Sequence, residues 1–430
     1  MSTKRSYDVV VVGGGPAGSA ASSILAAQGL RVAMLEREKF PRYHIGESLL
    51  PFCWFPLERM GMLKKMNASR FTRKYSVQFV SPEGRLSIPF YFHKHLDHPA
   101  AQTWQVLRSE FDQMLMDNAR EKGAEVFERM TAREILRTGD AVTGVKAVDQ
   151  HGATHECVAP MTIDATGRDA FAVSRNGWKV RDQHLNNKIA IWSYWDGAMR
   201  DAGIDEGATT IAFVPEKGWF WYIPLAGNIV SVGVVAEKEY LYGSGNRDLG
   251  EILHREIGKN PWVERHLAAG KQTGQYYVTG EYSYRSRYSA CDGLVLAGDA
   301  FGFLDPVFSS GVYLALRSGV MVADAVGEAL QAGEVSASRF TVYSAKLRQE
   351  IDAMRRLVYA FYSETFSFKD FCMDFPQHRG LVTDCLIGNL SPDFTQMFAD
   401  LTKYANVPPP LTHGVPLTGV AAGNQSAVGD

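Results

Sequence analysis

The sequence predicts an α/β protein: a Rossmann-like dinucleotide-binding fold that is interrupted by an inserted antiparallel sheet domain and followed by C-terminal helices. Three observations support this prediction. Residues 7–35 follow the order strand, glycine turn, helix, strand. Residues 188–236 contain several short runs of the β-branched and aromatic residues that favour strands. From residue 331 to about residue 402, helical spacing of apolar residues dominates.

The charge balance argues against nucleic acid as the main partner. The 430 residues include 45 Lys and Arg and 47 Asp and Glu, a formal net charge of −2, without long basic runs. Binding to phosphate backbones needs clustered basic residues. No apolar stretch reaches the roughly 20 residues of a membrane helix, and the N-terminal residues lack a signal-peptide apolar region. We therefore expect a cytoplasmic protein that binds neither nucleic acid nor membrane.

The cysteines and histidines predict neither a disulfide framework nor a metal site. The cysteines are odd in number and form no C-x-x-C pair, so small buried apolar side chains are their expected role. They are Cys53, Cys157, Cys291, Cys372 and Cys385. The tightest histidine group is His93, His95 and His98 in a segment typical of a loop, where metal binding is the less favoured interpretation.

The glycine turn after the first strand predicts a dinucleotide site. Gly13 permits the tight turn, Gly15 lets the backbone approach a pyrophosphate, and Gly18 allows close packing of the helix on the strand. The helix opens at Pro16 and Ala17 beside them, and its free N–H groups favour an anion. Glu36 follows the second strand and can accept hydrogen bonds from both ribose hydroxyls, which favours FAD or NAD over NADP.

Later segments return to the same fold. A helix is predicted over residues 108–122, a hairpin from strands 145–148 and 155–163, a short buried strand over 293–297, and a helix over about 311–330. The predicted dinucleotide fold is therefore discontinuous. We assign residues 1–75, 105–180 and 285–330 to it, residues 76–104 and 181–284 to a substrate-side sheet domain, and residues 331–430 to a C-terminal helical region with a Gly- and Ala-rich tail.

Three segments together resemble the FAD-binding fold of the class that includes aromatic hydroxylases. They are the glycine turn, residues 164–168 (Asp-Ala-Thr-Gly-Arg), and the pair Gly298-Asp299. The resemblance implies FAD as the cofactor, with Asp299 near its ribityl and pyrophosphate groups. Only one dinucleotide fingerprint is present, so we expect one bound dinucleotide and no separate nicotinamide domain.

Two further segments resemble the flavin-dependent halogenases. Residues 40–51, FPRYHIGESLLP, are similar to the G-E-S-L-L-P loop that lies against the isoalloxazine ring in that family, and residues 219–224, WFWYIP, match its W-x-W-x-I-P motif. Residues 71–79 resemble the family's K-x-G-A-x-F segment, with Lys74 at the catalytic lysine and Ser76-Val77 in place of Gly-Ala. The resemblance implies catalytic roles for Lys74, Trp219 and Trp221.

The resemblance and the glycine turn together give a set of expected cofactor-binding residues. It consists of Gly13, Gly15, Pro16, Ala17, Gly18, Glu36, Arg42, Gly46, Glu47, Ser48, Arg108, Asp164, Gly167, Asp299, Pro306 and Gly311.

Residues 305–311, DPVFSSG, resemble the family's flavin and halide loop. Backbone N–H groups of Ser310 and Gly311 at the start of a helix can hold chloride or bromide. Tryptophan halogenases carry a catalytic Glu in this loop, and this chain has Phe308 there. The resemblance therefore points to the branch that halogenates pyrroles and phenols, often tethered to a carrier protein.

The resemblance also implies a mechanism and partners. Reduced FAD and oxygen form a C4a-hydroperoxide, which oxidises chloride or bromide to hypohalous acid, and Lys74 directs this oxidant to an electron-rich arene. A compact lysine ammonium can donate a hydrogen bond to the oxidant, or form a chloramine once deprotonated. Because the single dinucleotide site holds FAD, we expect a separate NAD(P)H:flavin reductase.

Alternative functions remain open at this point. One is an FAD-dependent aromatic monooxygenase that uses NADPH directly; others are a prenyl-chain reductase and a non-catalytic flavin-binding protein. The aromatic residues within 359–375 favour core packing, with a pocket lid as the alternative. Four basic residues nearby favour a solvated helix face, with docking of an acidic carrier protein as the alternative: Lys346, Arg348, Arg355 and Arg356.

Overall fold

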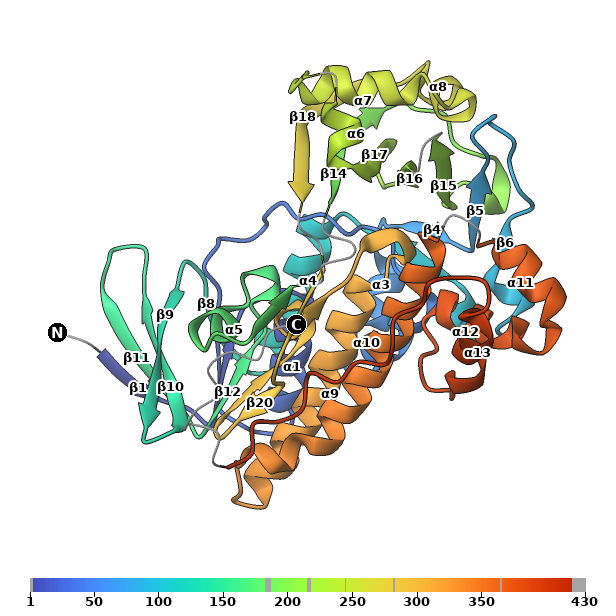
Figure 1. Ribbon diagram of the computed structural model, residues 1–430. Coiled ribbons are helices and arrows are strands. Elements are labelled where there is room, and N and C mark those ends of the chain that lie inside the picture. The colour runs from blue at the N-terminus through green and yellow to red at the C-terminus, as the bar shows by residue number, and fades with distance from the viewer. Residues whose placement is uncertain are drawn as a thin grey trace.

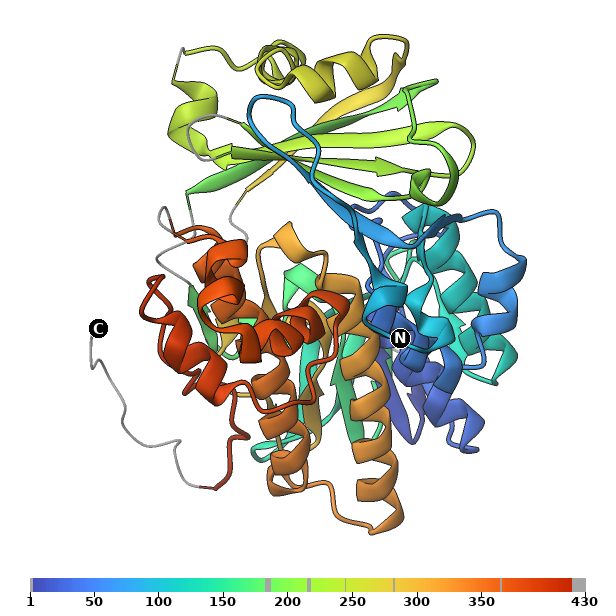
Figure 2. The ribbon, with the colours of Figure 1, turned by 90° about the vertical axis from the view of Figure 1, so that its right-hand side faces the viewer.

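A computed structural model describes residues 3–181, 187–214, 218–243, 245–280, 283–363 and 366–419. Residues 420–430 of the expected tail lie outside the described residues. Figure 1 shows an α/β layer and, above it, a second sheet covered by helices. Figure 2, turned by 90°, shows the upper sheet lying across the end of the lower layer.

A six-stranded sheet forms the centre of the lower layer. Its order is β20 (Ala290–Cys291), β21 (Leu294–Leu296), β12 (Met161–Asp164), β2 (Val9–Val12), β3 (Val32–Leu35) and β8 (Glu125–Phe127), all parallel except the β20–β21 pair. The strand, glycine turn, helix, strand order predicted for residues 7–35 is confirmed, with α1 (Pro16–Ala27) as the helix.

Strand β2 explains why both faces of this sheet are covered. All four of its residues are valines and all are buried. Val9 and Val11 belong to the core on the helix side, whereas Val10 and Val12 pack with residues of a second sheet. Because strand side chains alternate between faces, a continuous apolar run indicates burial on both.

Helices cover one face of the parallel sheet and a smaller sheet covers the other. Helix α1 packs between α4 (Arg108–Glu121) and α9 (Gly311–Gln331), and α10 (Thr341–Phe361) packs on α9. The opposite face carries the sheet β1 (Thr3–Ser6), β11 (Thr154–Val158), β10 (Ala141–Val148) and β9 (Thr131–Thr138).

The hairpin expected over residues 145–163 is wrong in its second half. The predicted strand 155–163 is two strands: β11 pairs with β10 and β1, whereas β12 joins the parallel sheet beside β2. Pro160 lies between them and has no N–H to donate to a continuous ladder. The chain therefore changes sheets at that point.

The upper sheet has seven strands. Their order is β18 (Lys271–Gly280), β14 (Lys188–Asp196), β17 (Ile229–Glu237), β16 (Gly218–Pro224), β15 (Thr209–Val214), β5 (Ser76–Val80) and β6 (Phe90–Tyr91). All neighbours are antiparallel except β15 and β5, which are parallel. The strands expected within residues 188–236 are confirmed, and β5 and β6 arrive from a distant part of the chain.

Helices cover only the outer face of this sheet (Figure 1). They are α6 (Lys238–Tyr242), α7 (Leu249–Ile257) and α8 (Pro261–Leu267). In β16, Phe220 and Tyr222 pack on this side, whereas Trp219, Trp221 and Ile223 belong to the core shared with the lower layer. The W-x-W-x-I spacing thus places both tryptophans on the inner face.

Smaller elements connect the two layers. Strand β4 (Thr72–Lys74) pairs with β7 (Thr103–Gln105), and β13 (Lys179–Arg181), β19 (Tyr284–Ser286) and β22 (Gly302–Phe303) form a three-stranded sheet. The remaining helices are α2 (Trp54–Arg59), α3 (Leu63–Ala68), α5 (Phe171–Arg175), α11 (Phe368–Asp374), α12 (Arg379–Ile387) and α13 (Thr395–Leu401). No helix within the described ranges is long and apolar enough to cross a membrane.

Gly18→Ala tests the close approach of α1 to the glycine turn. A Cβ at Gly18 would lie 1.8 Å from the Gly13 carbonyl oxygen, so the helix must move. We expect a loss of roughly 1–3 kcal/mol or more of unfolding free energy, the usual cost of overpacking, seen as a lower thermal midpoint. Gly380→Ala is the matched helical control, since nothing lies within 4 Å of its Cβ position. Equal midpoints for the two variants would contradict this packing.

Candidate functional site

A cavity of about 900 Å³ extends from the glycine turn to the inner face of the seven-stranded sheet. At one end it is lined by Gly13, Gly15 and Glu36, and at the other by Trp219 and Trp221. These residues come from the two layers of the fold. The predicted cofactor residues that line it are Gly13, Gly15, Pro16, Ala17, Glu36, Arg42, Gly46, Glu47, Ser48, Arg108, Gly167, Asp299, Pro306 and Gly311.

The turn between β2 and α1 forms a cradle that only glycine permits. Gly13 has φ +105°, and a Cβ there would lie 2.3 Å from the Ala165 carbonyl oxygen. Gly15 is the N-cap of α1, so the free N–H groups of the first helical turn lie beside it. The carboxylate of Glu36 accepts hydrogen bonds from the N–H groups of Gly14 and Glu38, both at 2.8 Å, which fixes it at the cavity edge.

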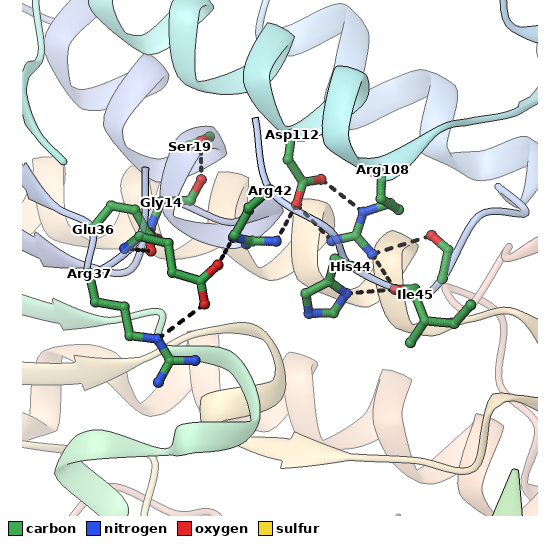
Figure 3. Close-up of polar contacts among 11 residues, drawn as sticks. Gly14, Ser19, Glu36, Arg37, Arg42, His44, Ile45, Arg108 and Asp112 are labelled. Atoms are coloured by element: carbon green, nitrogen blue, oxygen red, sulfur yellow. Dashed lines mark hydrogen bonds and ion pairs between the residues drawn. The ribbon is translucent and has the colours of Figure 1, made fainter. Parts of the chain in front are cut away.

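Two arginines share one buried carboxylate beside this cradle (Figure 3). Arg108 donates two hydrogen bonds to Asp112 (2.8 and 2.9 Å) and a third, 2.8 Å long, to the Ile45 carbonyl. Arg42 forms an ion pair with Asp112 at 3.3 Å, and its Nη2 atom lies 3.7 Å from the Cβ position of Gly15. Arg108 therefore holds the loop 40–51, and Arg42 places a positive charge next to the helix N-terminus.

His44, in the same loop, is a neutral imidazole. Its Nδ1 lies 2.6 Å from the Ile45 carbonyl oxygen, which can only accept, so Nδ1 carries the proton. Burial, with help from the charge of Arg108, lowers the pKa of His44 to about 3. His44 was not among the residues predicted for the site.

Glu47 is the one carboxyl side chain of the loop 40–51, and its pKa is raised. It is buried, and Tyr194 on β14 donates a 2.8 Å hydrogen bond to it. Burial raises the pKa of Glu47 to about 7, although hydrogen bonds from Ser231 and Tyr194 and the charge of Arg108 oppose the rise. Tyr43 contacts Tyr194 at 3.0 Å and accepts a hydrogen bond from Trp192, so the loop is tied to the upper sheet.

Asp164, Gly18 and Ser310 were expected at the site but are not among the described residues that line the cavity. Asp164 is buried and accepts hydrogen bonds from Thr166 and from the Ala172 N–H, so it shapes the 165–172 segment. Gly18 packs against the turn. Asp299 does line the cavity, and burial raises its pKa to about 6.

The two tryptophans of β16 are held by their indole nitrogens. Trp221 donates to Ser231 at 3.1 Å, and Trp219 donates to Tyr362 at 2.9 Å. Tyr362, which follows α10, in turn donates to Asp305 at 3.0 Å. The tryptophan wall is therefore linked to the loop 305–311 through the C-terminal region. Burial raises the pKa of Asp305 to about 6.

The loop 305–311 begins and ends with constrained residues. Asp305 accepts a hydrogen bond from the Val307 N–H, and Ser309 has φ +55°, in the left-handed region. Ser310 is the N-cap of the 21-residue helix α9, and Gly311 is its first residue. Ser309 and Gly311 line the cavity, and no atom lies within 4 Å of the Cβ position of Gly311. The first residue of α9 therefore borders the cavity, at the helix end where the first backbone N–H groups have no partner within the helix.

Lys74 lies behind the cavity wall. Its side chain has an exposed fraction of 0%. Its Nζ donates to the Ser48 hydroxyl at 2.8 Å and to the Leu49 carbonyl at 3.2 Å. Burial lowers the pKa of Lys74 to about 7. A buried amine with this pKa exchanges a proton readily near neutral pH.

Some C-terminal aromatic residues pack in the core and others contact the loop 305–311, whereas two of the basic residues make internal contacts. Phe371 is fully buried, whereas Phe361 packs on Phe308 of the loop and on Phe213 of β15. Arg355 is buried with Asp352, and Arg356 lies over the Phe398 ring at 4.3 Å. These two arginines therefore belong to internal packing and do not form an exposed basic face.

The three histidines of the 93–98 group are exposed and make ordinary side-chain contacts, and four of the five cysteines are buried. His98 accepts a hydrogen bond from the Ala100 N–H, and His95 stacks on Phe90 with ring centres 4.5 Å apart. Within the described ranges, no three His, Cys, Asp or Glu side chains form a possible metal site. The five cysteines are free thiols.

Comparison with known proteins identifies the class. The tryptophan halogenase family model matches residues 8–105 and 83–370. A 1H-pyrrole-2-carbonyl-[peptidyl-carrier protein] chlorinase of Pseudomonas fluorescens is 30% identical over 89% of each chain. The corresponding brominase of Pseudoalteromonas luteoviolacea is 32% identical over 78% of this chain and 80% of its own.

Solved structures agree. The flavin-dependent brominase Bmp2 superposes with a TM-score of 0.83 at 28% identity, covering 93% of this chain and 98% of that one. The myxobacterial chondrochloren halogenase CndH gives 0.78 at 29% identity, covering 93% and 97%. This chain belongs to the flavin-dependent halogenase family. It is a flavin-dependent halogenase, and its named relatives include enzymes acting on carrier-bound pyrrole.

Glu47→Gln tests the buried carboxyl of the loop. The folded-state pKa of about 7 lies above the ordinary value of 4.5, so the folded state holds the proton longer and wild-type stability falls as pH rises between these values. From pH 5 to pH 8 we expect the wild type to lose about 2–3 kcal/mol more unfolding free energy than the variant. Denaturant unfolding at both pH values, without flavin, measures this difference; identical pH dependence would contradict a buried, raised carboxyl.

Proposed function

We propose that this halogenase uses reduced FAD and oxygen to oxidise chloride or bromide to hypohalous acid, and that Lys74 directs its reaction with an electron-rich arene. The proposed arene is a pyrrole or phenol, free or bound to a carrier protein. The observation that carries this proposal is the single cavity that connects the glycine cradle with the tryptophan wall, directly in front of Lys74. The pyrrole-carbonyl relatives support the choice of substrate.

The residues of the cradle fit FAD. The tight turn at Gly13 and the N-terminus of α1 suit a pyrophosphate, and Arg42 lies beside them. Glu36 suits the adenosine ribose, and Asp299, Gly46 and Glu47 suit the ribityl chain and ring, whereas the Ser48 hydroxyl is engaged by Lys74 and Thr209. Bound in its reduced form, FAD would supply with oxygen the oxidising equivalent for the halide. We also propose that residues 1–75, 105–180 and 285–330 act as the cofactor-binding unit and 76–104 and 181–284 as the substrate-side unit.

The chain's own residues would divide the remaining work. The N–H groups at Ser310 and Gly311 would hold the halide at the start of α9. Trp219 and Trp221 would exclude water and block escape of the oxidant, since they form a buried apolar wall. Lys74 would direct the reaction of the oxidant with the arene from behind the cavity wall. A separate NAD(P)H:flavin reductase would supply the reduced flavin, because the one cradle is taken by FAD.

Lys74→Met tests the proposed role of the amine. Methionine fills the buried space without a charge, so we expect a stable fold, unchanged FAD affinity and loss of halogenated product by at least ~10²-fold, the usual range for a group that transfers protons. Lys74→Ala should behave alike in product formation. Lys94→Ala, an exposed lysine in the nearby 3₁₀ turn, is the control. Mass spectrometry of the product and flavin fluorescence on binding give the two readouts; persistent product in both Lys74 variants would refute the role.

The substrate class is tested with FAD, a flavin reductase, NADH and either halide. Pyrrole-2-carboxylate, simple phenols and 1H-pyrrole-2-carbonyl on a peptidyl carrier are supplied in turn, and we expect a halide-dependent mass shift in at least one. Rapid oxidation of NADPH by the purified protein alone, with hydroxylated product, would favour the aromatic monooxygenase instead.

A further inference from the structure

Two hydroxyl groups separate Lys74 from the cavity. Ser48 and Thr209 both line the cavity, and their hydroxyl oxygens are 2.8 Å apart. The Nζ atom of Lys74 lies 2.8 Å from the Ser48 oxygen, yet Lys74 is not among the described residues that line the cavity. A molecule in the cavity therefore meets the hydroxyl pair before it can meet the amine.

The hydroxyl pair Ser48 and Thr209 has one proton that it can donate to a ligand in the cavity. An ammonium at Lys74 can only donate, and it donates to Ser48. The side-chain amide of Gln105 donates to the Thr209 hydroxyl at 2.8 Å and to the Gly207 carbonyl at 2.9 Å. One of the two hydroxyl protons is used between Ser48 and Thr209. In the described part of the chain the other hydroxyl proton has no hydrogen-bonded side-chain acceptor, so it is left for a group in the cavity.

We propose that Ser48 and Thr209 form a hydroxyl relay through which Lys74 delivers and recovers the proton of the halogenation step. Ser48 is the member that contacts the amine, and Gln105 is a positioning residue that holds Thr209. This inference rests on the proposed function and deepens it, since it assigns the contact with the oxidant to hydroxyl groups and not to the amine itself.

In the proposed path, Lys74 gives one proton and takes one proton back in each turnover. As the oxygen–halogen bond of hypohalous acid breaks and the carbon–halogen bond forms, the oxygen takes a proton from the relay, which Lys74 replenishes, and leaves as water. The proton on the halogenated carbon then returns through the relay to the neutral amine. The net reaction converts arene and hypohalous acid to halogenated arene and water, and restores the ammonium.

The surroundings of the amine suit this exchange. Lys74 is enclosed by the loop 48–49 and by the Phe92 ring, whose centre lies 5.5 Å from Nζ. An amine in such an apolar enclosure loses its proton more easily than one in water. Free hypohalous acid reaching the amine directly would chlorinate or brominate it, and the hydroxyl pair blocks that approach.

Ser48→Ala tests the relay. With the arene that the wild type converts best, a flavin reductase, NADH and bromide, we expect product formation to fall at least ~10²-fold. Hypohalous acid trapped by the enol monochlorodimedone should persist, and FAD affinity should stay within about twofold of the wild type. The Ser48→Ala/Lys74→Met double variant should lose no more activity than either single variant, because both changes interrupt one path.

Thr209 supplies a matched pair of variants. Thr209→Val keeps the shape and removes the hydroxyl, and we expect product to fall about tenfold, the equivalent of one hydrogen bond. Thr209→Ser keeps the hydroxyl and should remain within about threefold of the wild type. Equal activity of the valine and serine variants would overturn the role of Thr209 in the relay.

Different results would contradict the hydroxyl relay and the proposed halogenase chemistry. If the wild type yields neither trapped hypohalous acid nor a halide-dependent product, the proposed function is wrong. If the wild type is active and Ser48→Ala keeps its product within about threefold, the relay is wrong while the function stands. Loss of FAD affinity in parallel with product in Ser48→Ala would also overturn the relay, because it would make the hydroxyl a flavin contact.

Discussion

The buried amine of Lys74 is the constraint on which the rest of the site depends. Burial of an amine is costly unless its hydrogen bonds are satisfied, and here the loop 46–51 supplies both acceptors, the Ser48 hydroxyl and the Leu49 carbonyl. Arg108 and Asp112 fix that loop from the helix side. The position of the amine is therefore set by the same segment that lines the cavity beside the glycine cradle.

The two layers meet around this segment. Tyr194 of the upper sheet bonds to Glu47, and Tyr362 after α10 joins Trp219 to Asp305. These tyrosines bridge parts of the chain that lie far apart in sequence. Together they close a dinucleotide cradle against an aromatic wall, a geometry that separates the place where an oxidant would form from the place where it would react.

Local patterns predicted much of this architecture. The glycine turn with Glu36, the valines of β2 and the alternating W-x-W-x-I all fix backbone geometry or burial through short-range rules, and the structure follows them. The 145–163 hairpin was wrong because Pro160 redirects the chain between sheets, an effect that apolar runs do not show. Thr209 and Tyr194 were missed because the loop residues that they contact, Ser48 and Glu47, lie more than 140 residues away in sequence. Lys74 was singled out by resemblance, but its position behind Ser48 depends on tertiary packing.

The proposed chemistry requires that the buried Lys74 amine titrate in the range where it can both give and take a proton. Nuclear magnetic resonance of protein labelled at the lysine ε-carbons measures this directly, with Lys74→Met to assign the signal. We expect a pKa of about 7 for Lys74, because burial lowers it from the ordinary value. A Lys74 signal titrating near 10.4, as for a lysine in water, would contradict it.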